Sequence, residues 1–404
     1  MAEPSDQRIW HYFWDAPHRP LFLGAFVCAF LTVGWWPLGV RLGLSLPAFD
    51  PIVLWHVHEL IFGFAGAAVG GYLLTALPSW TGRAPVKGAP LILLALFWAA
   101  ARIATAFADQ LPLLLPVSLN AGYFLFLASI LLNQSAKTGA KRGILFGTAV
   151  LVIGSVQCVF LISALSGPIW IAYALAQNVV IGFALLMTVI GTRAIPAFTN
   201  NWLARTEQPA KPITEATRSS KLAQMLLVAA LFGKIIGQDY AAHIALILAS
   251  ISLFHTMSGW RTTKAFADPL LAALHMGYLW VPLGLGFVGA IKFLPIAYPP
   301  SDAIHILTIG AMAGLIMAIS GRAASHQPSG VMKANGYFVA GVSLIWITTL
   351  IRLSAPLFPQ QSGEILMAAA IIWCVAWASF ILGYTPALRG PARRPVLSGS
   401  KHEA

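Results

Sequence analysis

The sequence predicts an all-α polytopic membrane protein with about twelve transmembrane helices and both termini on the cytoplasmic side. Of its 404 residues, 58% are hydrophobic and only 9% are charged, whereas about 25% of the residues of a soluble domain are charged. The mean hydropathy is +0.77. Apolar runs long enough to cross a bilayer, which takes about 20 residues, recur from one end of the chain to the other.

The apolar runs define the helices in chain order, and short polar connections separate them. We expect helices over residues 21–40, 52–78, 90–108, 112–133, 143–165, 168–191, 221–237, 240–257, 268–290, 302–321, 335–355 and 363–385. The longest connection, 192–220, contains NWLARTEQPAKPITEATRSSK and is expected to be a surface loop. Residues 1–20 form a cytoplasmic segment, 21–385 a single twelve-helix domain, and 386–404 a polar, disordered cytoplasmic tail.

The distribution of basic residues sets the expected orientation. With the N-terminus in the cytoplasm, most of the 25 Lys and Arg residues fall in cytoplasmic segments, as the positive-inside rule requires. The exceptions are Arg41, Arg102, Lys234, Lys292 and Arg352. The net charge of +12 is therefore topological. It indicates a protein in a lipid bilayer and no nucleic-acid partner.

The cysteines exclude a covalently attached haem. Cys28, Cys158 and Cys374 lie singly in apolar segments and form no CxxC or CxxCH motif. We expect them to be packed, inert residues. A cleavable signal peptide is not apparent in residues 1–20.

Seven of the ten histidines lie in or beside the predicted helices, and they form two groups by depth. Ionisable residues within a membrane are costly and mark ion paths, ligands or cofactors. The outer group consists of His56, His58, Glu59, His243 and His305. The inner group consists of His255, His275 and His326, with Arg193, Arg261 and Arg322 close by.

The stretch LWHVHELIFGF, residues 54–64, carries the densest cluster. Residues three apart share a helix face and residues two apart do not. His56 and Glu59 can therefore address one centre while His58 faces another partner. All three meet one metal only if the start of the helix is irregular, which Asp50-Pro51 permits.

Several chemistries fit these residues. Imidazole is the commonest metal ligand and a usual axial ligand of haem, and a carboxylate beside imidazoles suits non-haem iron. Glu59 can instead orient a histidine or deliver protons. The arginines can pair with haem propionates, or they can simply follow the positive-inside rule. A histidine that hydrogen-bonds between helices is the structural alternative, above all for His243 and His255.

Four stretches resemble the signature motifs of the NnrS family. They are LWHVHELIFGFAGAAVGGYLLTALPSWTG, GTRAIPAFTNN, PLLAALHMGYLWVPLG and IHILTIGAMAGLIMAISGR, and they occur in order. Around His326 this chain reads AASHQPSG, where the family pattern is close to GHTGR. The resemblance implies a bacterial inner-membrane protein that binds haem and in some accounts copper, and that is linked to nitric oxide stress and denitrification. It implies functional roles for His56, His58, His275 and His305, with Arg193 and Arg322 in support.

Three functions remain open at this point. The first is a nitric oxide reductase with haem b and a second metal, non-haem iron or copper, near the outer side. It would form nitrous oxide with electrons from a quinol or a small periplasmic electron carrier. The second is a haem protein that binds nitric oxide or protects against it without turnover. The third is a transporter, a class in which twelve helices are common.

Overall fold

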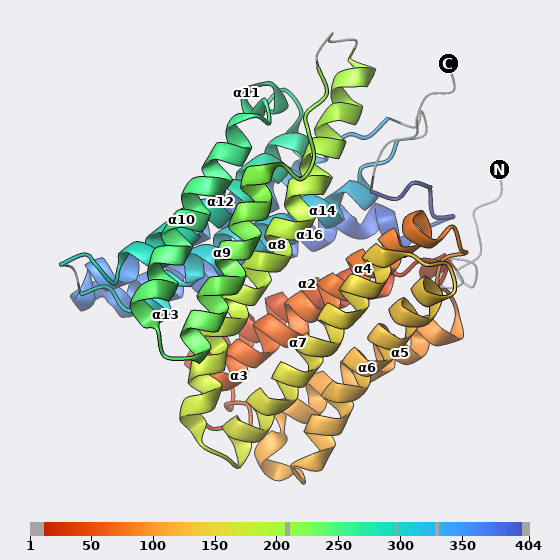
Figure 1. Cartoon of the computed structure of the whole chain (residues 1–404). Helices are drawn as coiled ribbons and strands as arrows, with labels where there is room; N and C mark the ends of the chain where they lie inside the picture. The colour runs from red at the N-terminus through yellow and green to blue at the C-terminus, as the bar shows by residue number, and fades with distance from the viewer. Residues whose placement is uncertain (1–11, 207–210, 296, 328–330, 398–404) are drawn as a thin grey trace. The chain divides into compact units, whose positions relative to one another are not determined.

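The fold was obtained as a computed structural model, which describes residues 12–206, 211–295, 297–327 and 331–397 (Figure 1). Within these residues, eleven helices are long and apolar enough to cross a membrane. This confirms an all-α polytopic membrane protein. Intrachain contacts divide the chain into two compact units. Unit 1 comprises residues 1–176, 323–331 and 381–404, and unit 2 comprises residues 177–322 and 332–380.

Unit 1 is built mainly from the first half of the chain. Its helices are α2 (His18–Val33), η1 (Gly34–Gly39), α3 (Ile52–His58), η2 (Glu59–Ala65), α4 (Gly66–Thr81), α5 (Ala89–Ala106), η3 (Ala108–Gln110), α6 (Leu114–Ala136) and α7 (Lys141–Leu165). α5, α6 and α7 run side by side (Figure 1). Small residues allow close packing here, because a Cβ added at Gly154 would lie 2.6 Å from the Phe124 Cβ atom.

Residues 386–397, predicted to belong to a disordered tail, contact unit 1 instead. The first three of them complete η8 (Thr385–Leu388). The buried Arg19 guanidinium donates to the Gly390 carbonyl at 2.7 Å, and the His326 ring bonds the Val396 carbonyl at 2.8 Å. The backbone carbonyls thus satisfy a buried arginine and a half-buried histidine, which composition alone does not reveal. Residues 398–404 of the predicted tail lie outside the described residues.

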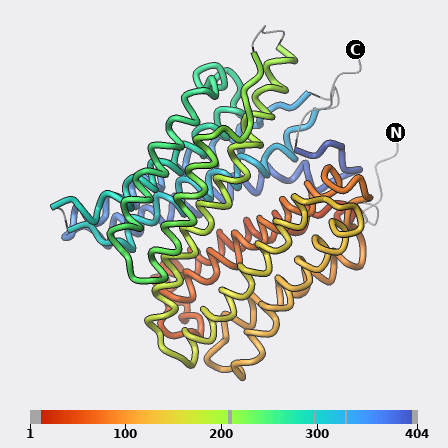
Figure 2. The backbone as a smooth tube through the Cα atoms, viewed as in Figure 1, coloured from red at the N-terminus to blue at the C-terminus, as the bar shows by residue number. Residues whose placement is uncertain are grey.

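Unit 2 contains most of the second half. α8 (Ile169–Arg205) enters it from unit 1. It then contains α9 (Arg218–Ile235), α10 (Asp239–Ser258), α11 (Thr262–Ala265), α12 (Pro269–Ala290), α13 (Pro300–Ala303), η4 (Ile306–Ala313), α14 (Gly314–Gly321), η5 (Arg322–Ala324), α15 (Gly336–Ser354), η6 (Ala355–Leu357), η7 (Pro359–Gln361) and α16 (Ser362–Tyr384). η5 and α16 also extend into unit 1. The trace in Figure 2 turns sharply from α9 into α10, where Gly237 adopts a φ of 75°, which glycine does at little cost.

The predicted surface loop over 192–220 is wrong in its first half, because α8 continues to Arg205. Ile195, Thr199 and Leu203 are buried and spaced by four, so this extension has its own packed face. Thr192 and Thr199 donate back to the carbonyls four residues earlier, at 2.7 and 2.8 Å. The polar sequence therefore forms a helix, because its hydroxyl groups hydrogen-bond to carbonyls of the same helix. Residues 207–210 of the predicted loop lie outside the described residues.

The predicted helix 221–237 forms as α9, which is 18 residues long but is not among the eleven apolar spans. Its ends carry Arg218, Lys221 and Lys234, which lower its mean hydropathy. Its buried residues Ser220, Ala223, Leu227 and Ala230 follow one helical face, and α9 packs against α10.

Candidate functional site

The His58 side chain is the centre of a buried polar network in unit 1. His58 is fully buried, and Glu59 is 3% exposed. The His58 Nδ1 atom lies 3.0 Å from the Glu59 Oε1 atom, and the His58 Nε2 atom lies 3.0 Å from the Gln157 Nε2 atom. Because an amide nitrogen only donates, His58 Nε2 must accept. His58 is therefore neutral and carries its proton on Nδ1, where it donates to Glu59.

Glu59 also accepts a charged hydrogen bond from α5. The Arg102 Nη1 atom lies 2.7 Å from Glu59 Oε1, and Arg102 Nη2 also donates to the Asn120 side chain. Asn120 in turn donates to the Thr105 hydroxyl at 3.0 Å. We call His58, Glu59, Arg102, Asn120 and Gln157 the His58 network.

Three members of the His58 network were not among the predicted site residues. Arg102 was one of the exceptions to the positive-inside rule, and no role was predicted for Asn120 or Gln157. All three are polar residues inside apolar runs, which is the signal that marks a functional or interhelical contact. Their partners could not be read from the sequence, because α3, α5, α6 and α7 meet only in the fold.

The sequence prediction grouped Glu59 with His56, whereas the structure joins Glu59 to its neighbour His58. The helix begins regularly as α3, and a π-helix, η2, begins at Glu59, so the irregular turn lies after His58 and not at the helix start. His56 is half-buried, and its ring packs edge-on against Trp36 with ring centroids 5.2 Å apart.

The same local arrangement occurs at His305 in unit 2. His305 is the residue immediately before the π-helix η4, as His58 is before η2. Each π-helix leads into an α-helix that begins with a glycine, Gly66 in unit 1 and Gly314 in unit 2. π-Helical turns are rare and occur frequently at functional sites. The two strongest sequence candidates thus share a backbone setting.

His275 lies fully buried in unit 2, with hydroxyl groups at both ring nitrogens. Its Nε2 atom is 2.9 Å from Thr199 Oγ1, and its Nδ1 atom is 3.1 Å from Thr262 Oγ1. Thr199 already donates its only proton to the Ile195 carbonyl, so it accepts from His275 Nε2–H. Thr262 then donates to Nδ1 when His275 is neutral. This tautomer is opposite to that of His58.

We expect replacement of Thr262 by valine to destabilise the protein by about 1–3 kcal/mol, because it leaves the acceptor on a buried imidazole unsatisfied. The adjacent Thr263 is exposed on the same short helix and provides the matched control, Thr263→Val. Thermal unfolding in a neutral detergent measures the difference. Equal unfolding temperatures for the two variants would show that Thr262 does not support His275.

The other predicted residues are dispersed. His255 and Arg193 are exposed. Arg261 donates to the Lys211 carbonyl at 2.6 Å. Arg322 is buried, with its guanidinium 4.3 Å from the centre of the Phe198 ring, so an aromatic face supports this charge.

His243 is the last of the predicted histidines, and its bonds lie wholly within unit 2. Its Nδ1 atom donates to the Val288 carbonyl at 3.0 Å, and its Nε2 atom accepts from the Lys234 ammonium at 3.1 Å. Because a lysine ammonium only donates, His243 is neutral. A donor thus already occupies its Nε2 lone pair.

The donor chemistry of the His58 network suits one axial haem ligand. Ligating histidines usually donate one ring N–H to a carboxylate or a carbonyl, which orients the other nitrogen toward the metal. His58 has this pattern with Glu59, and Gln157 holds the nitrogen that a metal would take. A second metal fits less well, because no group of three His, Cys, Asp or Glu side chains in the described part of the chain is arranged to hold a metal ion.

Comparison with known proteins gives one family. The family model described as NnrS protein matches residues 12–392, which is nearly the whole chain. No curated protein matches the chain. The match covers all the helices that carry the candidate histidines.

Proposed function

Because the chain belongs to the NnrS family, which is linked to the nitric oxide response, we propose that it reduces nitric oxide to nitrous oxide at a haem b held through His58. The observation that supports this proposal is the His58 network itself: a buried neutral imidazole, oriented by a carboxylate that a guanidinium holds in turn. The haem iron would bind nitric oxide and pass electrons to it.

The residues of the network have separate tasks in this proposal. Glu59 accepts the Nδ1 proton of His58, which leaves Nε2 as the nitrogen that would hold a haem. Arg102 fixes the carboxylate through a second bond, and the bond from Gln157 to Nε2 would have to give way to the metal. In this proposal Glu59 acts as a positioning residue, because His58 and Arg102 both engage its Oε1 atom.

The overall reaction joins two nitric oxide molecules with two electrons and two protons, and yields nitrous oxide and water. The electrons come from a quinol or a small periplasmic electron carrier. The described residues do not bring three ligands together for non-haem iron or copper, and no step is assigned to a second metal. We place the protein in the inner membrane of a bacterium, and the eleven apolar helices support a multi-pass membrane protein.

An anaerobic experiment on the purified full-length protein tests the proposal. Oxidised and reduced visible spectra report b-type haem, and nitric oxide loss with nitrous oxide formation after addition of a chemical reductant reports turnover. We expect His58→Ala to lose the haem spectrum and the activity. His255→Ala changes an exposed histidine and is the control. Binding of nitric oxide without product formation would establish a binding or protective protein. A purified protein that contains no haem would favour the transporter hypothesis.

The positioning role of Glu59 has its own expected result. Glu59→Gln preserves the size of the side chain but loses the carboxylate that holds His58, and loss of such a partner typically costs about 10–100-fold in metal affinity or activity. We expect weaker haem retention and a shifted reduced spectrum, since the altered bond at Nδ1 changes the basicity of the ligating nitrogen. Full turnover with an unchanged spectrum would remove Glu59 from the mechanism.

A further inference from the structure

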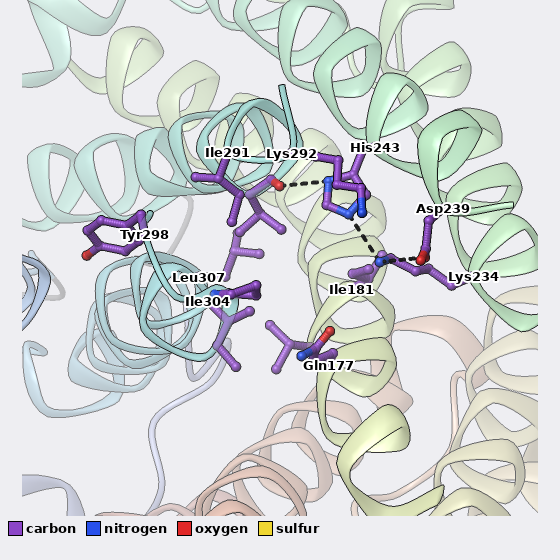
Figure 3. A pocket seen from close by; sticks show the side chains of 13 residues that line it. Gln177, Ile181, Lys234, Asp239, His243, Ile291, Lys292, Tyr298, Ile304 and Leu307 are labelled. Atoms are coloured by element: carbon purple, nitrogen blue, oxygen red, sulfur yellow. Dashed lines mark hydrogen bonds and ion pairs between the residues drawn. The ribbon is translucent and has the colours of Figure 1, made fainter. Parts of the chain in front are cut away.

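A cavity of about 350 Å³ lies within unit 2, where α9 ends, α10 begins and α12 ends (Figure 3). Small-molecule sites usually measure about 300–1,000 Å³, so the cavity can hold a small ligand or part of a larger one. Its polar lining comes from Gln177, Lys234, Asp239, His243, Lys292 and Tyr298. Apart from His243, none of these residues was a predicted site residue.

The lining carries an excess of positive charge. The Lys234 ammonium lies 3.0 Å from the Asp239 carboxylate and 3.1 Å from the neutral His243 ring. Lys292 lies over the Tyr240 ring, 5.1 Å from its centre, and no carboxylate of the described residues lies within ion-pair distance of it. Two ammonium groups therefore face one carboxylate, and Asp239 is half exposed to solvent.

The remaining wall is apolar and lies further along the helices. It includes Val180, Ile181, Val288, Ile304 and Leu307. The charged groups instead stand at helix ends: Lys234 near the last residue of α9, Asp239 at the first of α10, and Lys292 just beyond α12. Because α10 and α12 are long and apolar enough to cross a membrane, the change from charged to apolar lining is the one expected between a membrane surface and its interior.

We propose that this cavity binds an anionic amphiphile, with a phosphate or carboxylate head between Lys234 and Lys292 and a hydrocarbon chain against the apolar wall. A cation is disfavoured by two ammonium groups, and an uncharged head would forgo charge-assisted hydrogen bonds. A phosphate without a chain would leave the apolar wall uncovered. The inference does not rest on the proposed haem chemistry, since the cavity residues belong neither to the His58 network nor to the surroundings of His275.

Tyr298 is compatible with an anionic ligand in this cavity. Its hydroxyl donates to the Leu353 carbonyl at 2.7 Å. Burial and the nearby Asp302 carboxylate raise the pKa of this phenol, against the opposing effect of Arg352. The phenol therefore stays neutral and adds no negative charge to the cavity.

Native mass spectrometry of the full-length protein in a neutral detergent tests this proposal, with dodecyl phosphate as the probe. Dodecanol and inorganic phosphate supply the chain and the head separately. We expect one dodecyl phosphate per protein, and weaker binding by at least about ten-fold in Lys234→Gln and in Lys292→Gln, the size of one hydrogen bond to a charged group. Lys264→Gln changes an exposed lysine on α11 and should bind normally.

Two further variants are expected to change the affinity for dodecyl phosphate in opposite directions. Asp239→Asn removes the carboxylate that competes for Lys234 and should strengthen the binding of dodecyl phosphate, while Ile304→Phe fills the apolar part and should weaken it. The proposal would be overturned if neither lysine replacement changed the affinity for dodecyl phosphate, or if dodecanol bound as tightly as dodecyl phosphate. If inorganic phosphate bound as well as dodecyl phosphate and depended on the lysines in the same way, the ligand would be a free anion and the proposed amphiphile would be wrong.

Discussion

Replacement of Arg102 by methionine is expected to destabilise the protein by about 3–5 kcal/mol, the usual cost of removing one partner from a buried ion pair. Glu59 is nearly fully buried, and Arg102 holds it at 2.7 Å. Interhelical polar bonds in membranes usually contribute less, about 0.6 kcal/mol on average. The expected cost here is larger because a buried carboxylate loses its compensating charge.

A double variant separates the cost of leaving the Glu59 carboxylate unpaired from the loss of the interhelical bond itself. In Arg102→Met/Glu59→Gln the carboxylate is absent, so most of the lost stability should return, as measured by thermal unfolding in detergent. Arg41→Met removes an exposed arginine of unit 1 and should stay within about 0.5 kcal/mol of the unchanged protein. If Arg102→Met unfolds at the same temperature as Arg41→Met, the ion pair does not stabilise the fold.

The fold class was predictable because a bilayer imposes a simple rule on sequence: a span needs a long apolar run. The rule failed where polarity and helix formation diverge. α8 continues past its apolar part through Thr192 and Thr199, whose hydroxyls bond to their own helix. Such internal bonds are not visible in a hydropathy pattern. The helix predicted over 221–237, by contrast, forms as α9 and packs one face on α10.

The sequence singles out some residues of the candidate site, but it does not show which residues they contact. His58, Glu59 and His275 stood out as titratable groups in apolar runs, and all three are buried. Gln157 is 99 residues from His58, and Arg102 is 43 residues from Glu59. Such pairs are set by helix packing. The neutral tautomers of His58 and His275 follow from donors and acceptors that only the fold brings together.

The packing of α10 against α12 supports the cavity of unit 2, and it depends on Gly289. A Cβ added at this residue would lie 2.9 Å from the His243 carbonyl oxygen and 3.1 Å from the Ile247 backbone nitrogen. These are backbone atoms of a neighbouring helix, so no side-chain movement can relieve the contact. In the same region the His243 ring bonds to the Val288 carbonyl. This bond fixes the His243 ring and, with it, the position of Lys234.

Gly289→Val is expected to force α10 and α12 apart and to destabilise the protein by about 1–3 kcal/mol, as overpacking of a tight interface does. Binding of dodecyl phosphate should fall as well, since His243 and Lys234 move with α10 relative to Lys292. Gly182 in α8 provides the control, because a Cβ there has no atom within 4 Å. Gly182→Ala should be neutral or stabilise the helix by about 0.5–1 kcal/mol. Thermal unfolding and native mass spectrometry of both variants measure the two effects, and a Gly289→Val protein as stable as Gly182→Ala would contradict the close packing of α10 on α12.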